Sequence, residues 1–270
     1  MEQLADLLLT DPERTAGLAV ITVDDGYRDF YDHAWPILQQ EEVPATFFPV
    51  TGFVDGETWL WPDLVERALA CTDRRSVTAA SLGLPDDSRE WSMVKLHENR
   101  AAWQALIDYA IDLPDGDKWD FLRALYERLE LEWPMVIPAD FAPVTWDQLR
   151  ELNSNGIEIG AHTRTHCRLT RVDDVQLEDE LAGARGRLET QLDRPVVSLC
   201  YPNGAAEDYD SRVVAAAQAA GYRSAVTAFF DGIQGASYEL RRHGVGRDIY
   251  SFRKSLCGVD ELSRRLSGAT

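Results

Sequence analysis

The amino-acid sequence predicts an α/β fold in which parallel strands alternate with helices and one helical insertion interrupts the alternation. Short apolar runs rich in β-branched residues, LAVITV at 18–23 and ATFFPV at 45–50, are typical of parallel strands covered on both faces. Segments with helical spacing separate such runs, and the stretch 51–143 carries helical spacing throughout. Over 270 residues this alternation indicates a (β/α) barrel or a doubly wound sheet, taken here as a single domain 1–270.

The first half of the chain contains a strand–helix–strand unit and then the insertion. LAVITV leads into the helical segment YRDFYDHAWPIL, and ATFFPV follows as the second strand of a parallel βαβ unit. Within the insertion, helical spacing is clear in WPDLVERALA, KLHENRAAWQALIDYAI and KWDFLRALYERLEL. Five tryptophans of this stretch are interpreted as core or lid packing rather than a cofactor site: Trp61, Trp91, Trp103, Trp119 and Trp133.

The alternation resumes after the insertion. TWDQLRELNSNG has a capping box from Thr145 to Gln148 and predicts a helix that ends near Gly156. A helix is expected over 173–192. The expected strands are in IEIGAHTRTH, VVSLCYPNG, YRSAVT and YELRRHGVGRD, and further helices are expected in YDSRVVAAAQAAG, SFRKSL and DELSRRL.

Charge and composition exclude several classes of function. The formal net charge of −19 argues against nucleic acid as a partner. The sequence contains no run of about twenty apolar residues, so it does not predict a membrane-spanning segment. The N-terminus lacks the basic and apolar regions of a secretory signal, so a cytoplasmic location is expected. The chain has neither a GxGxxG motif nor a P-loop. Its cysteines are too widely spaced to predict a disulfide framework or a cysteine zinc site: Cys71, Cys167, Cys200 and Cys257.

Two adjacent acids follow the first predicted strand. Because successive side chains of a strand point to opposite faces, Asp25 could bind a cation while Asp24 stays free in the site, or the reverse. Gly26 would let the chain turn away without placing a Cβ at the mouth of the site. The alternative interpretation is an exposed Asp-Asp-Gly turn, which is common in proteins.

Two histidines in GAHTRTHCRL favour a cation site over an exposed turn. His162 and His166 stand four residues apart after another predicted strand, a spacing that lets two imidazoles face one metal ion. Together with one carboxylate they would supply three ligands and leave a position for water, as in catalytic zinc sites. In the later turn LCYPNG, the N–H of Asn203, after Pro202, could point into the same site and stabilise an oxyanion.

The ordered motifs TVDDG, HTRTH and CYPNG resemble those of the polysaccharide deacetylases of the NodB-homology type, carbohydrate esterase family 4. The resemblance covers about 18–50 and 145–248 and leaves the insertion, 51–143, outside the common core. It implies a distorted (β/α) barrel, a divalent metal that is usually zinc, with Co²⁺ or Ni²⁺ as alternatives, and hydrolysis of N-acetyl groups on a saccharide. The expected substrate is a polysaccharide, an oligosaccharide or a sugar precursor.

Carried over by position, the resemblance implies a role for each motif residue. Asp24 would be the general base, and the metal ligands would be Asp25, His162 and His166. Thr163 would orient the histidine loop. The backbone N–H of Asn203 would stabilise the oxyanion, and three residues are assigned to substrate binding: Tyr201, Pro202 and Arg242.

The sequence also departs from this family. Cys200 stands where many members carry an arginine that braces the catalytic aspartate, so Arg241 and Arg242 are the candidates for that role. No clean Leu-x-His motif is present, and His243 is therefore the candidate general acid. Two alternatives stay open: a hydrolase of another C–N bond, such as a cyclic amide or formamide, and a catalytically silent carbohydrate-binding homologue. The insertion is a candidate lid and a candidate oligomer interface.

Overall fold

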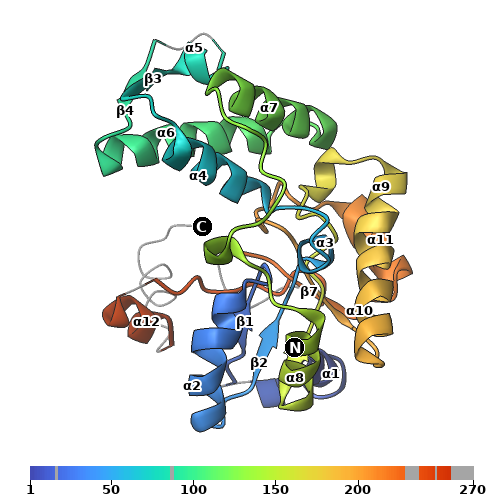
Figure 1. The fold of residues 1–270 in the computed structure, drawn as a ribbon. Coiled ribbons are helices and arrows are strands. Elements are labelled where there is room, and N and C mark those ends of the chain that lie inside the picture. The colour runs from blue at the N-terminus through green and yellow to red at the C-terminus, as the bar shows by residue number, and fades with distance from the viewer. Residues whose placement is uncertain (16–17, 86–87, 229–236, 247, 257–270) are drawn as a thin grey trace, which may run out of the picture.

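The computed structural model describes residues 1–15, 18–85, 88–228, 237–246 and 248–256, and parallel strands form the centre of the fold (Figure 1). These strands are β1 (Ile21–Val23), β2 (Ala45–Phe47), β5 (Ile157–Ile159), β6 (Ser198–Cys200) and β7 (Ser224–Val226). β2 lies between β1 and β5, and β6 pairs with β7. Single parallel bridges continue the ladder from Ala161 to Leu199 and from Val226 to Leu240. Each new strand is thus added on the same side of the previous one, as in a (β/α) barrel, whereas a doubly wound sheet reverses its order at a switch point.

Helices connect successive strands and cover the outside of this sheet (Figure 1). Capping contacts at Thr145 and Gln148 confirm the predicted start of α8, because each residue's side chain accepts the other's backbone N–H, at 3.2 and 2.9 Å. The helix expected at 173–192 is α9 and α10, joined through a π-helical turn at 179–183. The outer elements are α1 (Glu2–Thr10), η1 (Pro12–Thr15), η2 (Phe30–Ala34), α2 (Trp35–Gln40), α8 (Trp146–Ser154), η4 (Leu169–Arg171), α9 (Asp174–Glu178), η5 (Asp179–Gly183), α10 (Ala184–Leu192), α11 (Ser211–Ala219) and α12 (Ile249–Leu256).

The insertion forms a helical layer above the carboxyl ends of the strands and has an apolar core of its own (Figure 1). Leu64, Leu106 and Leu125, from three different helices, are fully buried in that core. The predicted packing role of its tryptophans is confirmed, because Trp61 and Trp91 are buried there and the other three pack against it. Its elements are α4 (Trp61–Cys71), β3 (Ser76–Thr78), α5 (Ala79–Leu82), β4 (Glu90–Ser92), α6 (Leu96–Ile111), α7 (Asp115–Arg128) and η3 (Ala139–Phe141). The short helix α3 (Thr51–Val54), also within 51–143, lies instead against α10 of the barrel (Figure 1). The antiparallel β3–β4 pair was not expected.

Two details of the sequence-based expectation are wrong. The run 18–23 is not covered on both faces, since Leu18, Val20 and Ile21 are 56%, 39% and 40% exposed. YELRRHGVGRD does not form a strand in its described part, where only Leu240 makes a bridge. Beyond Leu240 the chain instead turns the Arg242 side chain inward, onto residues of the first strand and its loop. The short helix expected in DELSRRL lies outside the described residues.

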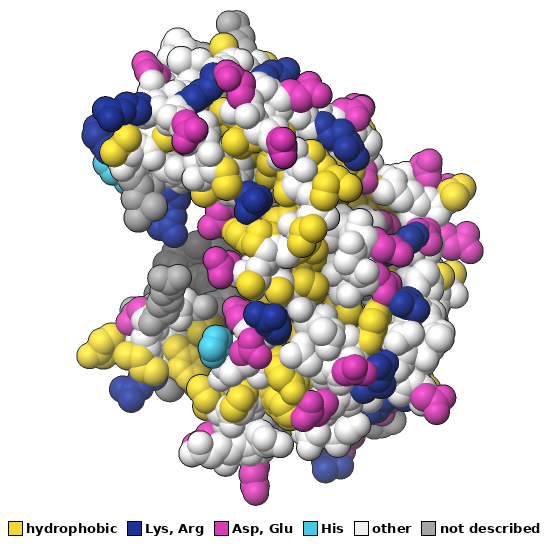
Figure 2. Space-filling model, viewed as in Figure 1, with side chains coloured by type: hydrophobic (Ala, Val, Ile, Leu, Met, Phe, Trp, Pro, Cys, Tyr) yellow, Lys and Arg dark blue, Asp and Glu magenta, His cyan; other side chains and the backbone are white. Residues whose placement is uncertain are grey.

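The surface matches the acidic composition. Acidic and basic side chains intermingle over the face seen in Figure 2 rather than gathering by sign.

Among the described residues, no helix combines the length and the apolar character needed to cross a bilayer. Cys71, Cys167 and Cys200 are free thiols, and Cys167, next to His166, is fully buried.

Candidate active site

The carboxyl ends of three parallel strands meet at one edge of the sheet because the strands pair in register. Val23 lies opposite Phe47, which lies opposite Ile159. The pairing continues into the loops: the Val50 N–H donates to the Asp25 carbonyl at 3.0 Å, and the His162 N–H donates to the Pro49 carbonyl at 3.2 Å. The residues that follow these strands are therefore brought side by side, although Asp25 and His162 stand 137 positions apart in sequence.

The structure brings Asp25, His162 and His166 together as one group of metal-ligating atoms. Asp25 Oδ1 lies 3.5 Å from His162 Nε2 and 3.4 Å from His166 Nε2, and the three ligating atoms all lie within 4.8 Å of one another. Ligands about 2.1 Å from a tetrahedral zinc ion stand roughly 3.4 Å apart. The donor set and its spacing thus fit a divalent cation with an open coordination position.

A hydrogen bond orients the His162 imidazole, and burial keeps the His166 imidazole neutral. His162 Nδ1 lies 2.8 Å from the Cys200 carbonyl oxygen, which favours a proton on Nδ1 and turns Nε2 toward Asp25. Burial, which disfavours the charged imidazolium, lowers the pKa of His166 to about 4 despite the opposing charge of Asp25, and His162 and Lys118 lower it further. His166 is therefore neutral at physiological pH, the form that binds a metal.

Two of these ligands, and Thr163 between the two histidines, have left-handed backbone conformations, which residues other than glycine rarely adopt. The φ angles are 75° at Asp25, 65° at Thr163 and 58° at His166. Thr163 is fully buried, and its Oγ1 accepts the His166 N–H at 3.1 Å, a contact that orients the histidine loop. Gly26 has a φ of 103°, and a Cβ there would lie 3.1 Å from Pro49. Such local strain is frequent where a functional geometry is imposed by its surroundings.

Asp24 lies beside this group and is held by Arg242. The guanidinium donates from Nη1 to Asp24 Oδ1 and from Nη2 to Oδ2, each at 2.7 Å, so the contact is bidentate. Burial raises the pKa of Asp24, but the Arg242 hydrogen bonds and the charges of His162 and Arg242 outweigh it and lower the pKa to about 2. Of the two arginines considered from the sequence, Arg242 makes this contact, and its guanidinium is committed to the protein itself.

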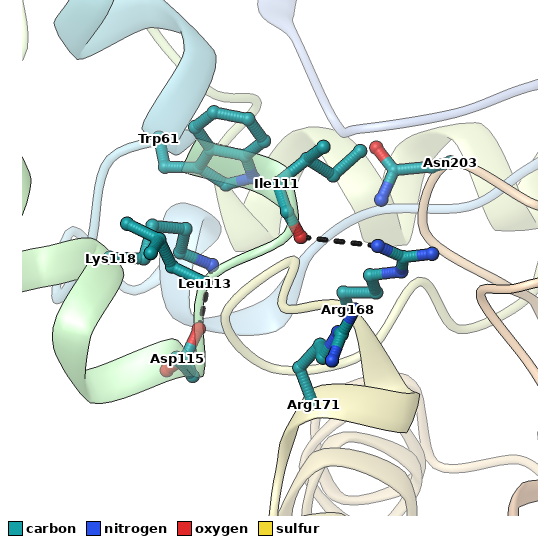
Figure 3. Close-up of a pocket in the computed structure, with 8 residues that line it drawn as sticks. All are labelled: Trp61, Ile111, Leu113, Asp115, Lys118, Arg168, Arg171 and Asn203. Carbon is teal, nitrogen blue, oxygen red and sulfur yellow. Dashed lines mark hydrogen bonds and ion pairs between the residues drawn. The ribbon is translucent and has the colours of Figure 1, made fainter. Parts of the chain in front are cut away.

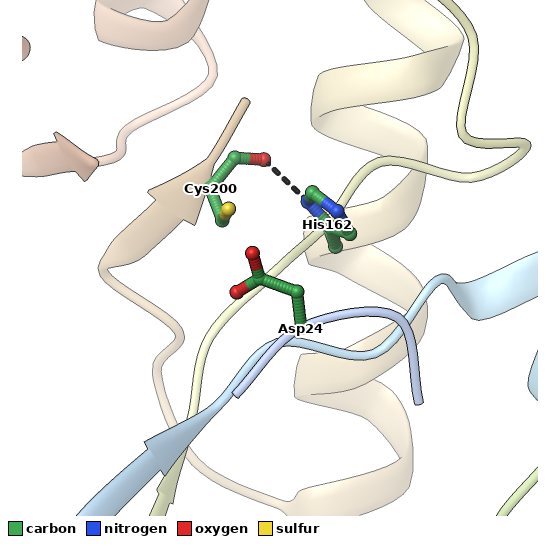
Figure 4. A group of neighbouring side chains, drawn as sticks. All are labelled: Asp24, His162 and Cys200. Carbon is green, nitrogen blue, oxygen red and sulfur yellow. Dashed lines mark hydrogen bonds between the residues drawn. The ribbon is translucent and has the colours of Figure 1, made fainter. Parts of the chain in front are cut away.

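Cys200 forms a second group of potential ligands with Asp24 and His162 (Figure 4). Arg242 Nη2 also lies 3.1 Å from Cys200 Sγ, so a cationic guanidinium already contacts both the thiol and Asp24. Burial raises the pKa of the Cys200 thiol and so favours its neutral form. This arrangement disfavours a cation at the second group, and the Asp25 group is the better metal site.

Replacing Arg242 by methionine is expected to raise the pKa of Asp24 above about 2, because the guanidinium would no longer oppose the effect of burial and only the charge of His162 and the Cys200 hydrogen bond would still lower the pKa. A titration of the Asp24 carboxyl followed by NMR in the metal-free protein would measure the change. Arg28→Met is a matched control, since Arg28 pairs with the exposed Asp32 on the surface. An unchanged Asp24 pKa in Arg242→Met would contradict the bracing role.

The turn after β6 presents Asn203 at the same edge. The Gly204 N–H donates to the Pro202 carbonyl at 2.7 Å, and Asn203 is exposed with a φ of 61°. Tyr201, assigned to substrate binding from the sequence, is only 1% exposed, and its ring stacks on Tyr209. Its side chain has almost no surface to offer a ligand and instead supports the turn. His243 is half-buried, with Nδ1 shielded from solvent.

A narrow crevice separates the insertion from the barrel next to this turn (Figure 3). Trp61 and Lys118 of the insertion face Arg168 and Asn203 of the barrel loops across it. Lys118 is 3% exposed; its ammonium group lies 2.6 Å from Asp115 Oδ1 and 5.3 Å from the centre of the Trp61 ring. Across the crevice, Arg168 Nη1 donates to the Ile111 carbonyl at 3.4 Å and to Asp112 Oδ1 at 2.7 Å, so polar contacts join the insertion to the barrel loops.

A further pair of polar residues at the site was not predicted. The Tyr27 hydroxyl lies 2.8 Å from each carboxylate oxygen of Asp63, which stands in the first turn of α4. Tyr27 follows Asp25 by two positions, which was a usable signal. Asp63 lies in an ordinary amphipathic helix of the insertion, so nothing in its sequence context linked it to the site.

Comparison with known proteins agrees with the resemblance seen in the sequence motifs. The family model described as polysaccharide deacetylase matches residues 11–72 and 125–225, and the unmatched stretch between them, 73–124, lies inside the helical insertion. A comparison with curated proteins finds no significant match.

Several solved deacetylase structures are similar to this chain. The Streptococcus pyogenes deacetylase PplD, solved in complex with acetate, is 17% identical with a TM-score of 0.54 over 89% of this chain and 70% of that one. A de-N-acetylase from Aggregatibacter actinomycetemcomitans is 15% identical with a TM-score of 0.49, covering 89% and 75% of the two chains. IcaB from Ammonifex degensii is 14% identical with a TM-score of 0.46, covering 88% and 71%. At this identity the likeness to PplD shows the fold, which is the distorted (β/α) barrel expected from the sequence.

Proposed function

This chain belongs to the polysaccharide deacetylase family, and from that premise we propose that it hydrolyses N-acetyl groups of a saccharide with the help of a divalent metal ion. The observation that carries the proposal is the group of Asp25, His162 and His166 next to an aspartate held by an arginine. Zinc is the proposed metal because two imidazoles and one carboxylate in tetrahedral spacing are its typical catalytic ligands, with Co²⁺ or Ni²⁺ as substitutes.

Asp24 is the proposed general base. With a pKa of about 2, its carboxylate is ionised throughout the physiological range and is available to accept a proton from the attacking water. The bidentate contact with Arg242 fixes the orientation of the carboxylate, so that little reorganisation accompanies the proton transfer. When bound, a divalent cation at the Asp25 group would polarise the acetamide carbonyl and activate water.

The Asn203 N–H is the proposed donor to the oxyanion that develops on the acetyl oxygen. A single donor of this kind contributes roughly 10²- to 10³-fold to the rate in well-studied hydrolases. The left-handed φ of Asn203 and the tight turn at Pro202 support this assignment, because they set the direction of that N–H relative to the site. His243 stays the sequence-based prediction for the group that protonates the leaving amine.

The proposed substrate carries N-acetylated amino sugars. Deacetylation converts a neutral amide into an amine that becomes cationic, and a protein with a net charge of −19 favours such a product electrostatically. Asn203, exposed at the rim of the site, would contact sugar hydroxyls, which are the groups that amide side chains bind well.

Acetate release from a panel of N-acetylated and O-acetylated saccharides tests the proposal, using protein stripped with a chelator and reloaded with zinc or cobalt. Release that depends on metal and ranks N-acetylated saccharides first is expected. Stoichiometric metal without acetate release from any saccharide would overturn the proposal. Release of ammonia or formate from cyclic amides or formamides would then support another C–N hydrolase, and saccharide binding without turnover would support the silent homologue.

A further inference from the structure

Asp63 is a buried carboxyl that the mechanism above does not use. It is 7% exposed, and both of its oxygens lie 2.8 Å from the Tyr27 hydroxyl. Tyr27 packs edge-on against Phe53, with ring centres 5.5 Å apart, so the hydroxyl has a defined position. The Asp63 carboxyl is therefore held in one place by a partner that belongs to the loop of the metal-ligand group.

The first turn of α4 lies between the two loops that build the site. Trp61, the first residue of the helix, lines the crevice opposite Asn203 (Figure 3). Asp63, two residues later, contacts Tyr27, which follows Asp25 by two positions. This helix turn thus reaches from the proposed oxyanion donor to the metal-ligand loop, and its carboxyl comes from a different element than Asp24.

The charge state of Asp63 differs from that of Asp24. Burial, together with the negative charges of Asp25 and Glu66, raises the pKa of Asp63 to about 7, and the Tyr27 hydrogen bond opposes this rise. The groups that act on it are Tyr27 and Asp25 from the loop after β1 and Glu66 on its own helix. Asp63 therefore retains a proton near neutral pH, where Asp24, with a pKa of about 2, does not.

Amide hydrolysis needs such a proton because an amine is a poor leaving group in its unprotonated, anionic form. We infer that Asp63 donates the proton that the leaving amine nitrogen takes up when the C–N bond breaks, an inference that rests on the proposed deacetylation. The electron pair of the C–N bond goes to nitrogen, and nitrogen accepts the Asp63 proton. Asp63 is left as a carboxylate that pairs with the amine product and regains its proton from solvent. Asp24 returns to solvent the proton that it took from water.

The leaving group provides the test. Asp63→Asn keeps an oxygen that can accept from Tyr27 but has no acidic proton, so it is expected to lower kcat for an N-acetylated saccharide by about 10²- to 10⁴-fold, the range for a general acid. An aryl acetate ester expels a phenolate that needs no proton, and its hydrolysis by the same variant should be unchanged. Asp120→Asn removes an exposed acid from helix α7 of the insertion and is expected to leave both reactions intact.

A pH profile supplies a second readout. Tyr27→Phe removes the hydrogen bond that favours ionised Asp63, so the pKa of Asp63 is expected to rise. The high-pH limb of the profile, where kcat for the amide falls because Asp63 loses its proton, should then move to higher pH. The same limb should be absent in Asp63→Asn. A merely structural role of the pair would lower both amide and ester hydrolysis and would leave the position of the limb unchanged.

The outcomes separate this inference from the proposed function. If the wild-type protein releases acetate and Asp63→Asn hydrolyses amide and ester in the wild-type ratio, the inference is wrong and the deacetylase stands. If His243→Gln, rather than Asp63→Asn, loses amide hydrolysis selectively, His243 is the acid and the inference is again wrong. If the wild-type protein hydrolyses no acetylated saccharide, the proposed function itself fails.

Discussion

Asp24→Asn is expected to remove nearly all turnover while leaving the metal bound. The asparagine side chain cannot accept a proton from water, and a positioned general base contributes about 10²- to 10⁴-fold to the rate. Asp24 is not in the three-residue group of Asp25, so metal content should stay stoichiometric. Steady-state acetate release and metal analysis of the same sample would measure both quantities.

The stability of this variant needs its own control. The pKa of Asp24 is lowered to about 2 in the folded protein, so its ionised form stabilises the fold above the unfolded pKa of 3.8, and this stabilisation is lost as the pH falls toward 2. At pH 7 the substitution should therefore cost up to about 2 kcal/mol of unfolding free energy. Asp32→Asn, which breaks an exposed aspartate–arginine pair at Arg28, should cost less and keep full activity. Normal turnover in Asp24→Asn would show that another group is the base.

Asp25→Asn is expected to lose both the metal and the activity. The substitution replaces an anionic oxygen ligand by a neutral amide oxygen, and the two imidazoles that remain form an incomplete site. Loss of a residue that merely supports a ligand already lowers metal affinity by about 10- to 100-fold, so removal of the ligand itself should exceed that range. Competition against a chromophoric chelator would give the zinc affinity of the variant and of the wild type.

His162→Ala extends the same test to an imidazole ligand. The substitution removes one ligand and is expected to weaken zinc binding as strongly as Asp25→Asn does. His33→Ala is its matched control, because His33 is exposed on a surface helix and should have no effect on metal affinity. Wild-type zinc affinity in both Asp25→Asn and His162→Ala would rule out this metal site.

Much of the fold could be predicted because it depends on local patterns. Buried parallel strands and amphipathic helices have different periods of hydrophobicity, and the capping box at Thr145 specifies a helix start within four residues. The conformation of the segment YELRRHGVGRD could not be predicted in this way. Its polar and glycine-rich sequence is compatible with an edge strand, and only the contact of Arg242 with Asp24 shows why the backbone leaves the sheet after Leu240.

The sequence by itself determined which residues could perform the chemistry: the adjacent aspartates, the histidines four apart and the turn at Pro202 are short motifs whose residue types and spacing suffice to suggest it. Only the tertiary structure decided which distant residues complete the site. In the folded chain, Arg242 binds the Asp24 carboxylate, and Asp63 contacts Tyr27, 36 positions away. Such pairs form because in-register parallel strands end at one edge and an inserted helix packs over it, and this geometry leaves no periodic trace in the sequence.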